Sequence, residues 1–173
     1  MNPRPDYMDD TTHAQWLVLP SEITEHGFVC VFPALQAQIR AFYAAERIDP
    51  RNIWLIPKEA LRNAQIHGTR EGEVFVYGLF MGQNGICHGI QDPGGFYKRT
   101  DVKGSLEAGL VPKGRDFEGP RRHGAESAGY GLGLIIEDSD LIEVDTGWGV
   151  LYCVQLRDRI IQPGLGEESG DPK

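Results

Sequence analysis

The clearest chemical pattern of the chain lies in residues 59–68, where Glu59, Asn63 and His67 recur every four residues and so share one face of a helix. A carboxylate and a carboxamide then point the same way. Together they can orient a water or hydroxyl, and they can ligate Mg²⁺, which takes oxygen donors and keeps several waters beside substrate phosphates. An exposed amphipathic helix also places Glu and Asn at this interval, so the spacing alone leaves both interpretations open.

Two later glycine motifs have chemical meaning of their own. Asp92 ends an apolar run and is followed at once by turn-forming residues 93–95, a pattern that a plain hairpin turn shares. Gly129, Gly131 and Gly133 alternate ahead of an apolar stretch that would start a helix. Glycines let the backbone approach a ligand closely, and a helix N-terminus offers free N–H groups to phosphate, although an ordinary loop is the alternative. The order of all three motifs is more specific than any one of them.

In that order the motifs resemble the GHKL ATPase superfamily, of gyrase, Hsp90, histidine kinase and MutL type. Within it they resemble most the small anti-sigma-factor serine/threonine kinases. Residues 59–68 resemble the N box, residues 92–96 the first glycine box and residues 129–134 the second, and the similarity spans residues 17–156. One departure is visible: the family usually has Asp-x-Gly-x-Gly, whereas residues 92–96 are Asp-Pro-Gly-Gly-Phe, one residue tighter.

The resemblance implies ATP and Mg²⁺ as cofactors and a role for each motif. Asn63 would supply an amide oxygen to Mg²⁺, and Glu59 would be the base that accepts a proton from, or orients, the attacking hydroxyl or water. Asp92 would accept a hydrogen bond from the exocyclic amine of adenine, at a place where guanine presents a carbonyl. His67 and Gly68 are expected to end the helix.

The glycines would complete the site. Gly94 and Gly95 would let the chain pass close to the base. In the second glycine box, Gly129 precedes the N–H groups of Gly131, Leu132 and Gly133, which would cradle phosphate.

Composition restricts the class of protein. The 173 residues are 40% hydrophobic and 24% charged, which fits one globular domain with a full core. A net charge of −8 argues against nucleic acid or an anionic membrane as the main partner. No apolar run reaches the ~18 residues of a membrane span and no secretory signal is evident, so we expect a cytoplasmic protein. Cys30, Cys87 and Cys153 lie in apolar, strand-like sequence and are predicted to be buried free thiols.

The predicted domain covers residues 13–162, between flexible tails at 1–12 and 163–173. Its expected elements are strands at 13–19 and 27–32 that would pair as a hairpin, helices at 34–48 and 53–67, a hairpin of strands 73–81 and 86–91, a helix at 131–138, and strands at 141–144 and 149–156. Pro57 either kinks the second helix or lies in its first turn.

Residues 93–128 lose this periodicity, and their seven basic side chains outnumber five acidic ones. A stretch of this length without regular structure predicts a lid over the nucleotide, with basic groups suited to phosphate oxygens. A solvated mobile loop is the alternative.

These elements predict an α+β fold, a two-layer sandwich in which helices cover one face of an antiparallel or mixed sheet. The resemblance implies the same architecture, the Bergerat-type ATP-binding fold. It also implies a kinase that transfers the γ-phosphoryl group to a regulatory protein and binds a sigma factor, with a homodimer expected by analogy with the dimeric kinases. A binding module without catalysis, or a detached domain that hydrolyses ATP, are the alternatives.

Overall fold

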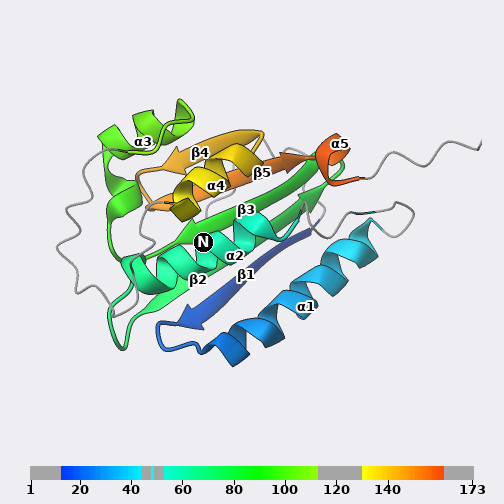
Figure 1. The fold of residues 1–173 in the computed structure, drawn as a ribbon, viewed down its shortest axis with the longest axis horizontal. Coiled ribbons are helices and arrows are strands. Elements are labelled where there is room, and N and C mark those ends of the chain that lie inside the picture. Colours follow the sequence, from blue (N-terminus) through cyan, green and yellow to red (C-terminus); the bar gives the residue numbers. More distant parts are fainter. Residues whose placement is uncertain (1–12, 44–47, 49–52, 113–129, 162–173) are drawn as a thin grey trace, which may run out of the picture.

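The computed structural model describes residues 13–43, 48, 53–112 and 130–161, and it is an α+β sandwich of a five-stranded sheet and packed helices (Figure 1). The strands, in the spatial order β1-β2-β3-β5-β4, are β1 (His13–Pro20), β2 (Val74–Gly82), β3 (Gly85–Gln91), β5 (Val150–Leu156) and β4 (Leu141–Asp145). The helices are α1 (Glu25–Phe42), α2 (Leu55–Asn63), the π-helical η1 (Ala64–Gly68), the 3-10 helix η2 (Phe96–Lys98), α3 (Thr100–Glu107), α4 (Tyr130–Asp138) and α5 (Arg157–Ile160). Every neighbouring pair of strands is antiparallel, so the predicted two-layer sandwich is confirmed.

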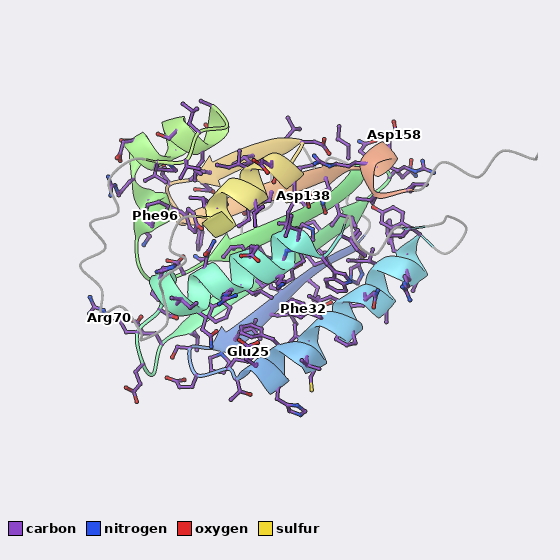
Figure 2. All side chains as sticks on the ribbon, viewed as in Figure 1. Glu25, Phe32, Arg70, Phe96, Asp138 and Asp158 are labelled. Atoms are coloured by element: carbon purple, nitrogen blue, oxygen red, sulfur yellow. The ribbon has the colours of Figure 1, made fainter. Side chains whose placement is uncertain are left out.

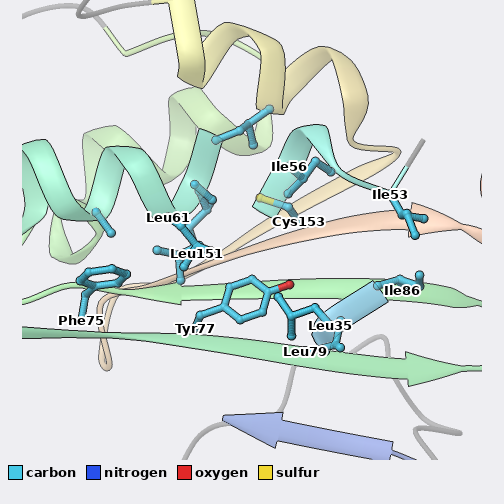
Figure 3. Close-up of a cluster of buried hydrophobic side chains, with 14 of the residues drawn as sticks. Leu35, Ile53, Ile56, Leu61, Phe75, Tyr77, Leu79, Ile86, Leu151 and Cys153 are labelled. Atoms are coloured by element: carbon cyan, nitrogen blue, oxygen red, sulfur yellow. The ribbon is translucent and has the colours of Figure 1, made fainter. Parts of the chain in front are cut away.

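The main core lies between the sheet and the helices, because alternate residues of a strand face opposite sides of a sheet. Figure 3 shows this cluster, in which Ile56 and Leu61 of α2 lie over Tyr77 of β2 and Leu151 of β5. The opposite face of the sheet carries a second buried cluster with Trp16 packed against it, formed by Phe80, Cys87, Val150, Tyr152 and Val154.

The first helix differs most from the sequence prediction. Residues 27–32 were expected to form a strand paired with residues 13–19, but they belong to α1, and β1 pairs with β2 instead. The Thr24 side chain caps α1 by accepting a hydrogen bond from the N–H of Gly27. Pro33 lies inside the helix on its exposed side, where water can replace the donor that the Val29 carbonyl loses.

The end of α1 is also earlier than expected, since Phe42 is its last residue and Tyr43 its C-cap. The Tyr43 hydroxyl lies 2.7 Å from the Gly82 carbonyl and 2.9 Å from the Gly85 carbonyl, which fastens α1 to the β2–β3 hairpin. The change from strand to helix also exposes Cys30, contrary to the prediction, whereas Cys87 and Cys153 are buried free thiols as predicted.

Both later hairpins are confirmed. The loop between β2 and β3 consists of Gln83 and Asn84, with Gly82 paired to Gly85, and β4 pairs with β5 across the predicted turn. Of the two alternatives for Pro57, the structure has the second, because α2 begins at Leu55 and Pro57 lies in its first turn, where a missing N–H costs nothing.

The predicted lid is wrong in its first part, since residues 96–107 form η2 and α3. Val102 and Leu106 bury the inner side of α3 in the main core. The remaining residues of the predicted lid, 113–128, and both predicted tails lie outside the described residues.

A line of buried polar side chains runs through the core toward α4. The Tyr77 hydroxyl lies 2.7 Å from Nδ1 of His88, and Nε2 of His88 lies 3.3 Å from Oε1 of Gln155. Gln155 donates through Nε2 to Oδ2 of Asp138 at 2.9 Å, at the end of α4 that lies toward α5 (Figure 2). The Gln155 amide thus has its oxygen toward His88, so Nε2 of His88 is protonated and Nδ1 accepts from Tyr77. Burial lowers the pKa of His88 to about 4, which keeps the ring neutral.

Candidate functional site

The two polar residues of the helix motif lie where the sequence predicted them, on one side of α2 near its C-terminal end. Glu59 and Asn63 are one helical turn apart and half-buried, and the apolar residues Ile56, Ala60 and Leu61 hold α2 against the sheet. The side of α2 that carries Glu59 and Asn63 faces α4, which lies beside α2 (Figure 1).

Gly131 of α4 makes this approach close. A Cβ atom placed on Gly131 would lie 2.9 Å from Oε2 of Glu59 and 3.2 Å from both amide atoms of Asn63. Contacts of real Cβ atoms are rarely this short, so any larger residue here would displace these two side chains. The helix motif and the second glycine motif, far apart in sequence, therefore meet through Glu59, Asn63 and Gly131.

The first turn of α4 brings backbone N–H groups to this meeting point. Gly131, Leu132 and Gly133 all lie within it, and the first four N–H groups of an α-helix have no acceptor inside the helix. The Leu132 side chain is buried in the core, which orients the turn. Positive partial charge at a helix N-terminus favours an anion there.

A change of helix type follows Asn63 directly. Residues 64–68 form a π-helical turn, an uncommon conformation that is frequent at functional sites. The wider turn moves His67 off the regular four-residue line of Glu59 and Asn63. As predicted, the helix ends at His67 and Gly68; the Thr69 hydroxyl donates to the carbonyls of Ala64 and Gln65, at 3.1 and 3.0 Å.

Asp92 lies directly after β3 and is packed against this helix end. A Cβ atom on Gly68 would lie 2.5 Å from Oδ2 and 2.6 Å from Cβ of Asp92, so only glycine lets the carboxyl reach this place. Oδ1 of Asp92 accepts a hydrogen bond from the N–H of Gly94 at 3.0 Å. A Cβ on Gly94 would in turn lie 3.0 Å from the Gly68 carbonyl, and Gly95 has φ of 74°, a left-handed conformation that favours glycine. The tighter spacing of the first glycine motif, residues 92–96, thus corresponds to a turn that packs against Gly68.

The environment of Asp92 is costly for a charge. Asp92 is 8% exposed, and burial raises its pKa to about 7. The hydrogen bond from Gly94 lowers the pKa and the nearby charge of Glu73 raises it, both by less than burial does. A carboxyl whose pKa lies near neutrality beside an exposed turn is typical of a group that exchanges a proton or a hydrogen bond with a ligand.

One continuous helical segment links the two groups of residues. Gly68 follows Asn63 by five positions and Glu59 by nine, so the two groups lie apart along the same segment. The segment thus has a buried acceptor, Asp92, at one end, and a carboxylate, an amide and the N-terminal turn of α4 toward the other.

The other predicted residues divide into two sets. Gly129 and four of the basic residues of the predicted lid lie outside the described residues. Of the three described basic residues, Arg99 pairs with Asp101 and Lys103 with Glu107, while the aliphatic part of Lys98 packs over Gly149. Lys103 and Arg99 are thus used within the fold. No group of three or more His, Cys, Asp or Glu that could hold a metal occurs in the described part of the chain.

Sequence reasoning missed the contribution of Gly68. Gly68 was expected only to end the helix, but its lack of a side chain also leaves the space that the Asp92 carboxyl occupies. The signal was a glycine placed directly after the four-residue pattern, which is equally the signature of a helix end.

Comparison with models of protein families, with characterised proteins and with solved structures found no match for this chain.

Gly68→Ala tests the close packing of Gly68 against the Asp92 side chain. We expect the added methyl group to push the carboxyl away and to lower the free energy of unfolding by about 1–3 kcal/mol, as overpacking does. The matched control is Gly104→Ala in α3, where an added Cβ would meet no atom of the described residues within 4 Å beyond its own helix backbone, and where alanine should raise stability by up to about 1 kcal/mol. Urea unfolding of both variants checks this, and an unchanged stability in Gly68→Ala would show that Asp92 moves freely.

The raised pKa of Asp92 predicts a pH-dependent stability. Because the folded protein holds this proton more tightly than the unfolded chain, the contribution is fully present below about pH 4, is lost as pH rises to about 7, and is constant above that. The full loss is at most about 4 kcal/mol, from three pKa units at 1.36 kcal/mol each. Asp92→Asn should remove this part of the profile, so its stability relative to wild type should increase from pH 4 to pH 7. A constant difference would contradict the assignment.

Proposed function

We propose that this chain binds Mg²⁺-ATP along the segment from Glu59 to Gly68, with adenine at Asp92 and the phosphates at the first turn of α4. The observation that carries the proposal is the contact of Gly131 with Glu59 and Asn63. It joins a helix motif and a glycine motif that the sequence separates by more than sixty residues. The packing of α4 on α2 would not by itself need a carboxylate and an amide at the point where the two helices are closest.

Recognition of adenine would rest on Asp92. An ionised carboxylate accepts the hydrogen bond that the exocyclic amine donates, whereas the carbonyl of guanine at that position would be repelled. Oδ1 already accepts from Gly94 on one side. Since a carboxylate oxygen has further lone pairs, a ligand can be added without losing that bond.

Asn63 would ligate Mg²⁺ through its amide oxygen. The phosphates and water would complete the coordination, because Mg²⁺ in phosphate-binding sites keeps several waters and binds through few protein ligands. The N–H groups of Gly131, Leu132 and Gly133 would stabilise phosphate oxygens at the positive end of the α4 dipole.

Glu59 supports a catalytic rather than a purely binding role. A module that only held ATP would need Asn63 for the metal but would gain nothing from a carboxylate beside the γ-phosphate, where it adds repulsion. A base that takes a proton from the attacking hydroxyl would need it there. We therefore propose phosphoryl transfer to a serine or threonine of a regulatory protein, with a sigma factor as a further partner.

The setting of this activity follows from the resemblance of the three motifs to the anti-sigma-factor kinases. We propose a cytoplasmic protein that acts on another protein, since the acidic chain is poorly suited to nucleic acid. Among the described helices, none combines the length and the apolar character that crossing a bilayer requires.

The proposal predicts that the protein binds ATP and ADP more tightly than GTP and GDP in titration calorimetry. Asp92→Asn should weaken adenine nucleotides most, because its amide can turn a donor toward the adenine amine. Gly131→Ala should also weaken ATP, since its methyl group would displace Glu59 and Asn63. The matched control, Gly104→Ala, lies in α3 outside the proposed site, and among the described residues its methyl would meet no atom within 4 Å beyond the backbone of its own helix, so ATP binding should be unchanged. Equal affinity for adenine and guanine nucleotides would contradict the proposal.

Catalysis is tested separately with Glu59→Gln, which keeps the size of the side chain but removes the proton acceptor. ATP affinity should stay near the wild-type value, while single-turnover phosphoryl transfer to the partner protein should fall by roughly 10²–10⁴-fold. Asn63→Ala should instead weaken both Mg²⁺-dependent binding and transfer. If Glu59→Gln is as active as wild type, the chain binds ATP without using Glu59 as a base.

A further inference from the structure

The helix that presents Gly131 to Glu59 and Asn63 has two kinds of contact with the rest of the fold. Leu132 and Ile135 bury one side of α4 in the main core. Apolar contacts of this kind are not directional, so they hold the helix against the core without fixing where it lies along its own axis. Hydrogen bonds have a preferred distance and angle, and they can fix that position.

The last residue of α4 makes such directional contacts. Oδ2 of Asp138 accepts a hydrogen bond from Nε2 of Gln155 at 2.9 Å, and Oδ1 lies 3.4 Å from the Arg159 guanidinium (Figure 2). Gln155 is fully buried on β5, an interior strand of the sheet, whereas Arg159 lies on α5 and is partly exposed. The Asp138 carboxylate thus joins the C-terminal end of α4 to the middle of the sheet.

The same carboxylate sets the direction of every hydrogen bond in the buried polar line. A carboxylate only accepts, so Gln155 turns its NH₂ group toward Asp138 and its oxygen toward His88. Nε2 of His88 then carries the proton, and Nδ1 accepts from the Tyr77 hydroxyl at 2.7 Å. A flipped Gln155 amide would bring two acceptors together at Asp138. Each group of the line therefore has one orientation, and a fully satisfied buried network of this kind is rigid.

We propose that Gln155 and Asp138 are positioning residues of the nucleotide site, which hold α4 so that its first turn keeps Gly131 against Glu59 and Asn63. The helix is regular from Gly131 to Asp138, a rise of about 10 Å, so a shift at one end is carried to the other. This role rests on the proposed ATP site for its function. Its structural part can be tested without any nucleotide.

The alternative is that the line only satisfies its own polar groups inside the core. Two observations favour positioning. The line ends on the helix that carries Gly131. In addition, a Cβ on Gly131 would lie 2.9 Å from Oε2 of Glu59, so the two helices are in such close contact that a small displacement of α4 changes the arrangement of Glu59 and Asn63.

Gln155→Glu is the decisive variant, because it keeps the shape of the side chain but replaces the NH₂ group with an acceptor, so that two carboxylates meet at the end of α4. The double variant Gln155→Glu/Asp138→Asn exchanges the carboxylate and the amide. It restores one donor opposite one acceptor, and its asparagine oxygen can still accept from Arg159.

The matched control is Val154→Ala. Val154 precedes Gln155 on β5, is equally buried and faces the opposite side of the sheet. The change lowers stability by leaving a cavity, and it keeps the Val154 carbonyl that accepts from the N–H of Asp140 at 2.8 Å. It therefore separates a loss of stability from a displacement of α4.

Nuclear magnetic resonance of the full chain without nucleotide gives the first measurement. Gln155→Glu should shift the resonances of the Gly131 backbone amide and the Asn63 side-chain amide. The double variant should return them toward their wild-type positions, and Val154→Ala should leave them in place. If circular dichroism shows that Gln155→Glu is unfolded, Asp138→Ala, at a half-buried position, should shift the same resonances. Unshifted resonances in the folded variant, or equal shifts in Val154→Ala, would overturn the proposal.

Calorimetry with ATP and with AMP gives the second measurement, since AMP has the base but lacks the outer phosphates. Gln155→Glu should weaken ATP at least about tenfold, the loss expected for one hydrogen bond to a charged group, and should leave AMP unchanged. An equal loss for both nucleotides would indicate a merely structural role and overturn the proposal. A wild type that binds no nucleotide would contradict the ATP site, and the resonances would still decide whether Gln155 and Asp138 position α4.

Discussion

The close crossing of α4 against α2 is the constraint on which the candidate site depends. It exists because Gly131 has no side chain, and it requires that α4 be held in place from its other end. There Arg159 donates to the Glu137 carbonyl at 2.9 Å and contacts the Asp138 carboxylate, while Gln155 donates to the same carboxylate from inside the core. A cation at a helix C-terminus is favourable to the helix dipole, so one arrangement anchors α4 and satisfies its last carbonyls.

The second constraint is the buried carboxyl of Asp92. A well-packed apolar residue would be cheaper at this position, because a buried carboxyl must hold a proton or bear a poorly solvated charge. The surrounding chain instead supplies a hydrogen-bond donor at Gly94. It also has a glycine at position 68, which leaves room for the Asp92 carboxyl. Features that cost stability and are built by several residues together are expected at sites of function.

The sequence predicted the hairpins and α2 well, because alternation, turn residues and helical spacing are local signals. It failed at residues 27–32, where Val, Cys and Phe favour a strand on propensity alone. The cap at Thr24 and the burial of Phe28, Leu35 and Ile39 at helical intervals decide for a helix, and the spacing runs across Pro33, which had seemed to separate two elements. Tertiary burial outweighed local preference there.

At the site, the spacing of Glu59 and Asn63 was readable, and so was the special chemistry of Asp92. The packing role of Gly68 could not be read from the sequence. It depends on contact with the Asp92 side chain, twenty-four positions away, and no periodicity reveals such a contact. The helix α3 was missed for a related reason, since only Val102 and Leu106 face the core and give it a weak apolar pattern. In the sequence, Lys103 and Glu107 resemble solvated residues. In the structure they form hydrogen bonds with the backbone of β4.

The order of strands has a consequence for how the molecule assembles. The pairs β2–β3 and β4–β5 are local hairpins, whereas β3 and β5 join only after the long segment between Gln91 and Val150 has closed. Loop closure of this length slows folding, so the two hairpins should form before the sheet is continuous. Asp92 ends the first hairpin and α4 leads into the second, so the candidate site exists only in the fully joined chain. A ligand that bridges these elements would therefore stabilise a pairing between strands that are far apart in the chain.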